Sequence, residues 1–177
     1  YKNPGSRRFS MEPDAYLPAN FLKIGEAVPN FIVRNKALLF SAGISCSSMG
    51  IPFGACALPA GGTFGVNANV FCEEEDRLWL LAYLNSSLVT YLVRGVLLRT
   101  NMITSGYVSR IPLVPLSEEG RTTLASIAGD AVRRTIGREA YPAAIEAIDQ
   151  VVFAESALPA EDVSMIREFS ANIMKRT

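Results

Sequence analysis

Side chains that could carry out catalysis are scarce in this chain of 177 residues, which contains no histidine. Without histidine a serine-hydrolase triad is excluded, and no serine stands in the glycine-flanked turn that such a nucleophile needs. The cysteines Cys46, Cys56 and Cys72 lack metal-type spacing, so we interpret them as buried free thiols. Consecutive acids from Glu73 to Asp76 are typical of a helix start. The sequence therefore predicts a binding chain that is not an enzyme by itself.

Motifs that bind a cofactor or a target base are also missing. The Ala60–Gly65 stretch is rich in glycine, but it has neither the lysine nor the helix start of a phosphate-binding loop. No glycine loop joins a strand to a helix with an acidic residue behind it, as a dinucleotide-binding fold requires. Asn3-Pro4-Gly5 lacks the second proline and the aromatic residue with which amino-methyltransferases hold a base. We expect no cofactor and no metal within this chain.

Polar and basic residues in several places could instead contact a nucleic acid, since Arg, Lys, Asn and Ser read base edges and cations bind phosphates. These places are a basic patch near the N-terminus, a basic pair before the first expected strand, a serine-rich loop after it, and the end of a Leu-rich helix. In chain order, the candidates are Arg7, Arg8, Arg34, Lys36, Ser45, Ser47, Ser48, Arg94, Arg99 and Asn101.

Each group of candidates also has a simpler explanation. The N-terminal arginines could be solvated linker residues, and the pair before the strand could be charges that discourage edge pairing. The serines could hydrogen-bond their own loop, and the two later arginines could cap a helix C-terminus. Composition leaves these alternatives open.

The overall charge is zero, with 17 basic and 17 acidic side chains, which argues against strong binding to DNA without regard to sequence. The charge is unevenly distributed, because basic residues exceed acidic ones before residue 61 and acidic residues exceed basic ones after residue 116. Phosphate contact depends on local density of cations, so DNA remains a possible partner. Hydrophobic residues make up 49%, which fits either an apolar face for another domain or a tightly packed monomer.

The first half of the chain predicts a small sheet. The apolar run Lys36–Ala42, stopped by Gly43, is typical of a central strand, and Gly54–Leu58 of a second. Ala60–Thr63 has the glycines of a tight turn, so we expect a hairpin that leads into a third strand, Phe64–Phe71. The sheet should be mainly antiparallel.

A Leu-rich helix is expected from about Glu75 to Val93, with leucines at helical spacing on one face: Leu81, Leu84, Leu88 and Leu92. The stretch is apolar enough to raise the possibility of a membrane span, but polar residues interrupt it. We interpret it as a buried core helix in a cytoplasmic protein that does not enter a membrane.

The rest of the chain predicts an extended segment, Tyr107–Leu116, at the sheet edge, followed by helices. These helices should span about Ser117–Ile136, Pro142–Ala154 and Ala160–Met174. The predicted class is α+β, a small antiparallel sheet packed on a Leu-rich helix, followed by a C-terminal helical portion. We divide the chain into an N-terminal arm or linker (1–30), an α+β core (31–116) and a helical region (117–177).

Short motifs follow one another in a characteristic order: Gly43–Ser47, Phe64–Asn67, Leu80–Ser86 with its Leu-Asn-Ser, Gly106–Pro112 with its Ile-Pro, and Ala147–Val151. In content and order they resemble the C-terminal specificity region of TaqI-like adenine-specific DNA methyltransferases. That family includes single-chain restriction-modification enzymes and BREX-type phage-defence enzymes. The chain departs from the family at Gly65, where an acidic residue is usual, and at the apolar Phe53–Ala57, where a basic-aromatic segment is usual.

The resemblance implies a target recognition domain that binds duplex DNA and performs no chemistry. It also implies a methyltransferase domain of the same chain, with its S-adenosylmethionine, on the N-terminal side of Tyr1. Gly43, Asn85 and Pro112 would shape turns and helix packing, and they would not meet bases. The rival hypothesis is a protein-interaction or scaffolding domain, which the neutral charge and high apolar content favour. Salt separates the two hypotheses, since DNA binding weakens steeply as salt rises.

Overall fold

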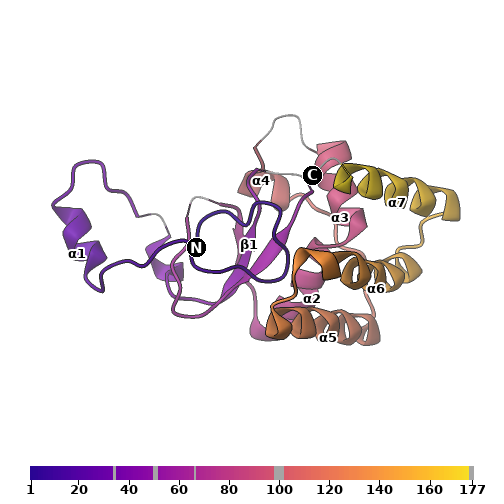
Figure 1. Ribbon diagram of the computed structural model, residues 1–177, viewed down its shortest axis with the longest axis horizontal. Coiled ribbons are helices and arrows are strands. Elements are labelled where there is room, and N and C mark those ends of the chain that lie inside the picture. Colours follow the sequence, from indigo (N-terminus) through magenta and orange to yellow (C-terminus); the bar gives the residue numbers. More distant parts are fainter. Residues whose placement is uncertain (34, 50–51, 66, 98–101, 176–177) are drawn as a thin grey trace.

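The computed structural model describes residues 1–33, 35–49, 52–65, 67–97 and 102–175, and it confirms the α+β class (Figure 1). A three-stranded sheet is followed by a helix that packs on it and by further helices that pack on that helix and on one another. In chain order the strands are β1 (Gly43–Cys46), β2 (Ala55–Leu58) and β3 (Asn69–Val70). The main helices are α1 (Phe21–Glu26), α2 (Glu74–Leu84), α3 (Ser87–Tyr91), α4 (Ser105–Val108), α5 (Glu118–Arg134), α6 (Tyr141–Glu155) and α7 (Ala160–Met174).

The sheet is antiparallel, as expected, but its order is β2-β1-β3, so the expected hairpin is wrong. The turn itself forms, with Gly61 at φ 80°. It does not pair the strands on either side of it, because β3 crosses over to pair with β1 and is only two residues long. The middle position of β1 explains Gly43, where a Cβ would lie 2.8 Å from the Val70 carbonyl oxygen.

The first strand begins later than the sequence predicted. Lys36–Leu38 is a short 3-10 helix, and the strand starts only at Gly43. Residues on both sides of this helix have a left-handed backbone conformation, with Asn35 at φ 52° and Phe40 at φ 69°. Phe40 is held there because its N–H donates to the Gly62 carbonyl and its own carbonyl accepts from Gly61 N–H, at 3.1 and 2.8 Å. These bonds link distant residues, so the local apolar run gave no sign of them.

The Leu-rich helix is not continuous. It forms α2, breaks at Asn85, resumes as α3 and ends in a π-helical segment, η2 (Leu92–Leu97). The two halves, Glu74–Leu84 and Ser87–Leu97, are bent by 64° to each other. No single helix in the described part of the chain is long and apolar enough to cross a membrane, although this bent pair passes the same test of length and composition together.

The core lies between the sheet and the helices. Ile44 and Cys46 of β1 face Leu81 and Ala82 of α2, and all four side chains are fully buried. On its far side α2 packs against α5, which contacts α6 in turn, while α3 packs against α7. Figure 1 shows these C-terminal helices stacked beside the sheet. The sheet thus supports the bent helix pair through its contacts with α2.

The C-terminal helices confirm the sequence predictions within a residue or two. Their boundaries follow from local signals, such as the Ser117 hydroxyl that accepts from Gly120 N–H at 3.0 Å at the start of α5. Glu161 and Asp162 occupy the first turn of α7, where they offset the helix dipole. By contrast, the expected extended segment Tyr107–Leu116 is wrong at its start, because the short helix α4 runs to Val108, and no residue of the segment belongs to the sheet.

The N-terminal residues divide into two parts with different environments. Residues 1–10 run across the sheet, and Phe9 is fully buried beside β2, with its N–H and carbonyl bonded to Ala55 and Ala57 at 2.8 Å each. Residues 11–33 form a protruding arm that carries α1 and projects from the body at one end (Figure 1). Only this second part has the character of the arm that the sequence predicted.

Candidate functional site

The break between α2 and α3 is built around the amide of Asn85. This fully buried side chain donates to the carbonyls of Ala55 and Leu81 at 2.9 and 3.0 Å, and its oxygen accepts from Ala55 N–H at 3.0 Å. One side chain thereby satisfies both backbone groups of a β2 residue and one carbonyl of α2. Asn85 is therefore structural, as the motif resemblance implied, and it fixes the angle at which the second half of the helix leaves the sheet.

Buried polar groups hold the start of α3 in the same way. The Ser86 hydroxyl accepts from Val89 N–H at 3.2 Å as the helix cap, and the Asp149 carboxylate of α6 accepts from Ser87 N–H at 2.8 Å. The Ser170 hydroxyl of α7 donates to the Ser87 carbonyl at 3.1 Å. Burial raises the pKa of Asp149, while its hydrogen bonds to Ser87 oppose that rise. Both later helices therefore clamp the bend.

Arg8 belongs to this buried centre, and its expected role at a DNA surface is wrong. The side chain is 2% exposed, and its Nη1 donates to the Asn85 carbonyl at 2.8 Å. Its backbone N–H donates to the Tyr141 hydroxyl at 3.1 Å. Burial lowers the pKa of Arg8 to about 10, and the Asp149 charge partly opposes this effect. Arg8 thus ties the N-terminal segment to the helix bend.

The serine candidates are also mostly unavailable. Ser45 and Ser47 are fully buried, so neither can meet a base edge in this structure, and these two expectations are wrong. The alternative explanation holds for Ser47, whose hydroxyl accepts from Gly54 N–H at 3.1 Å. Ser48 is partly exposed, and its backbone bonds to Asn3 and Ile103. Ser45 is buried because all four residues of β1, the central strand, are buried, so neither face of this strand is open to solvent.

Two other candidates remain at the surface. Arg7 is partly exposed, but its Nε donates to the Pro4 carbonyl at 3.2 Å and its Nη2 lies 3.8 Å from Asp14. Lys36 is exposed at the base of the arm, on the short helix and not at a strand edge. Arg34, Arg99 and Asn101 lie outside the residues that the structure describes.

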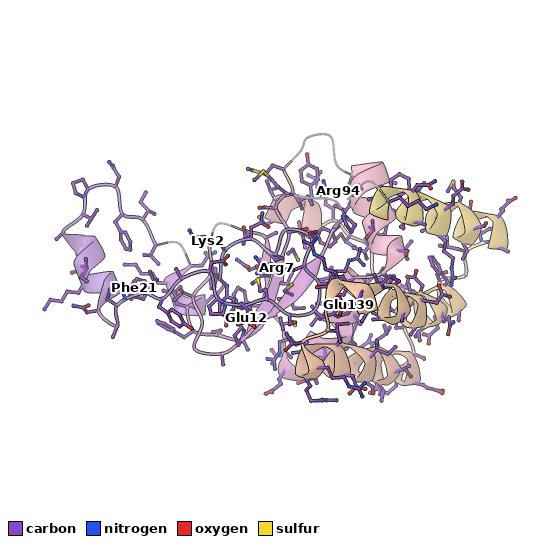
Figure 2. All side chains as sticks on the ribbon, in the orientation of Figure 1. Lys2, Arg7, Glu12, Phe21, Arg94 and Glu139 are labelled. Atoms are coloured by element: carbon purple, nitrogen blue, oxygen red, sulfur yellow. The ribbon has the colours of Figure 1, made fainter. Side chains whose placement is uncertain are left out.

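Arg94 is the candidate whose side chain has shielded donors without an acceptor among the described residues. It lies on η2, where the bent helix approaches α4 (Figure 2). Its Nε and Nη2 are shielded from solvent, yet no described residue accepts a hydrogen bond from either. Burial lowers the pKa of Arg94 from its usual value. A charged donor that has lost water and gained no acceptor is costly, so this guanidinium is destabilised in the structure as described.

Sequence reasoning missed two surface features. Arg110 is exposed just after α4, and among the described residues it makes no ion pair. The sequence predicted an extended segment here, so it did not indicate that Arg110 follows a helix and lies at the surface. The second feature is a groove of about 410 Å³ between β3, α2 and α4, whose walls come from three separate parts of the chain. No sequence pattern signals such a groove.

The arm forms a further surface. Tyr16 and Ile32 are 89% and 74% exposed, and Leu17, Ile24, Val28 and Phe31 are also exposed. A cavity of about 430 Å³ separates the arm from the Gly61–Gly62 turn, with Phe21 and Phe40 in its wall at 6.4 Å between ring centroids. Such a run of exposed apolar side chains is unusual on a domain that works alone.

Comparison with models of known protein families and with curated proteins gives no match for this chain.

Proposed function

We propose that this chain is a DNA target recognition domain, which binds duplex DNA without catalysis as part of an adenine-specific methyltransferase or methylating restriction enzyme. The motif order supports this proposal, and Asn85 and Gly43 have the structural roles that the resemblance implied. S-adenosylmethionine would be bound by a methyltransferase domain ahead of Tyr1. In this arrangement the recognition domain would hold the duplex while the catalytic domain acts on a base rotated out of the stack.

The observation that carries the proposal is the Arg94 guanidinium. Arginine binds phosphate through planar, charge-assisted hydrogen bonds, and half or more of protein–DNA hydrogen bonds go to the backbone. The Nε and Nη2 groups of Arg94 are shielded from water and have no acceptor among the described residues, so a phosphate oxygen admitted beside them would supply the missing hydrogen bonds. The π-helical turn that carries them is a distortion often found at functional sites. Arg94 would therefore bind a phosphate, and the neighbouring Arg99 and Asn101 would supply contacts to DNA from the segment that follows.

The test is Arg94→Met, measured by fluorescence anisotropy with a duplex that contains the recognised site. We expect affinity to fall about tenfold and the slope of log affinity against log salt to become shallower by about 0.9, as for one lost phosphate contact. Arg133→Met is the matched control, because Arg133 is an exposed arginine that pairs with Asp130 on α5. Equal affinity of the two variants across the salt series would refute the role of Arg94.

Stability separates a binding role from a structural one. Replacing a desolvated, unpaired charge by an apolar side chain of similar length is often neutral or stabilising. Arg94→Met should therefore unfold at the same temperature as the wild type or a higher one, while it loses DNA affinity. In the natural full-length protein, methylome sequencing should show weaker methylation at an unchanged sequence.

A second function, docking onto another protein domain, is favoured by the exposed apolar arm. We propose the methyltransferase domain of the same natural chain as the partner. Hydrogen exchange of residues 15–32 should then be at least about tenfold slower in the full-length protein than in this chain alone, because docked amides open less often. The amides of α7 serve as the internal control, since they should exchange equally in both. Equal, fast exchange of the arm in both proteins would exclude docking through it.

A further inference from the structure

The two edges of the sheet differ in whether other backbone covers them. On the β2 side, Phe9 pairs in parallel with Cys56 and covers the edge with backbone hydrogen bonds. On the β3 side, no described residue continues the sheet. An uncovered edge presents unpaired backbone groups, which proteins usually protect. The β3 edge is therefore a place where another strand could add.

The register shows which backbone groups face outward. Cys46 N–H donates to the Ala68 carbonyl at 2.8 Å, and Ser45 stands opposite Asn69. Hydrogen-bonded and non-bonded pairs alternate along an antiparallel ladder, so the Ser45–Asn69 pair is non-bonded. The N–H and carbonyl of Asn69 therefore point away from β1. Among the described residues neither group has a hydrogen-bond partner.

The groove of about 410 Å³ lies alongside this edge. Its floor is apolar and comes mainly from Leu80 and Leu84 of α2 and Val108 of α4. Leu113 stands at the groove with 56% of its surface exposed. Outward backbone donors and acceptors beside a row of apolar walls match the needs of an extended peptide, whose backbone pairs with the edge while alternate side chains enter the groove.

We propose that the β3 edge and this groove bind an extended peptide segment of a partner protein, with apolar residues at alternate positions. A nucleic acid does not fit here, because none of the described lining residues is charged and phosphates require cations. The site is therefore distinct from the Arg94 surface, and the proposal does not depend on the DNA function. The peptide would add a fourth strand, antiparallel or parallel, beside Asn69.

The probe is a short synthetic peptide in which valine alternates with threonine between terminal lysines, titrated into the ¹⁵N-labelled chain. Amide shifts should centre on Asn69, Phe71 and Val108. Successive N–H groups of a strand point to opposite edges, so two N-methylated peptides provide the critical comparison. Methylating either all valine or all threonine amides should weaken binding at least about tenfold in one peptide only, because only one set faces β3.

A variant tests the groove itself. Val108→Asp should abolish the shifts by placing a charge in the apolar floor, while Met165→Asp, on exposed α7, should leave them unchanged. If Val108→Asp does not fold, the binding of the two N-methylated peptides to the wild-type protein still tests the proposal. The proposal is overturned by the absence of shifts, by shifts centred elsewhere, or by equal binding of both methylated peptides. Sedimentation that shows pairing of two copies through β3 would also overturn it, since the occupant would then be a second copy.

Discussion

Replacing Asn85 by alanine should lower the free energy of unfolding by about 3 kcal/mol, because three buried hydrogen bonds vanish and the Ala55 N–H is left without its acceptor. The Ala55 carbonyl keeps its bond from Phe9 N–H at 2.8 Å, but the Ala55 N–H and the Leu81 carbonyl lose their bonds to the amide. Neither group gains water in compensation, since the site is fully buried. Urea denaturation followed by circular dichroism measures the change.

Asn172→Ala is the matched control for this prediction. Asn172 is exposed on α7, so the same chemical change there should alter stability by about 0.5 kcal/mol or less. If both variants unfolded at the same urea concentration, Asn85 would not be the anchor of the bend. The anchor also matters for binding, because Arg94 lies on the segment that leaves this bend.

Asp149→Ala should be the second large loss, at about 3 kcal/mol. The carboxylate is 2% exposed and accepts from Ser87 N–H at the start of α3. Its charge also acts on buried Arg8, whose own contact reaches the Asn85 carbonyl. Removing Asp149 leaves one buried donor without an acceptor and one buried cation without its nearby negative charge. The measurement is the midpoint of thermal unfolding together with urea denaturation.

Asp130→Ala gives the comparison for Asp149, because Asp130 is a partly exposed helix residue paired with Arg133 and Arg134 at the surface. Surface pairs contribute about 1 kcal/mol or less, so this variant should remain close to the wild type. A loss of the same size in both variants would mean that burial and the bond to Ser87 do not distinguish Asp149. A double variant with Asn85→Ala should lose less than the sum, since both residues support one bend.

Local sequence signals were sufficient for the C-terminal half of the fold. Helices α5, α6 and α7 begin and end within a residue or two of the prediction, because caps, acidic first turns and apolar spacing act over a few residues. The strand β2 was predicted for the same reason. The break at Asn85 was missed, since its cause is a hydrogen bond to Ala55, thirty residues earlier in sequence.

The candidate site was predictable only in part. Sequence reasoning selected Arg94 by residue type and place, and the structure adds that its guanidinium lacks an acceptor among the described residues. The same reasoning selected Arg8, Ser45 and Ser47, which are buried. Exposure depends on which face of an element the rest of the chain covers, and residue type does not carry that information.

Residue types and local patterns were enough to predict the α+β class and the C-terminal helices, to exclude histidine chemistry and to supply the motifs that suggest DNA recognition. The strand order, the bend at Asn85, the burial of Arg8 and the edge beside Asn69, which no described residue covers, arise only when distant segments come together. The two groups of features differ because the interactions behind them act over different separations along the chain. Helix propensity and capping act between neighbours in the chain, whereas burial, strand pairing and the satisfaction of buried polar groups depend on segments that meet only when the chain folds.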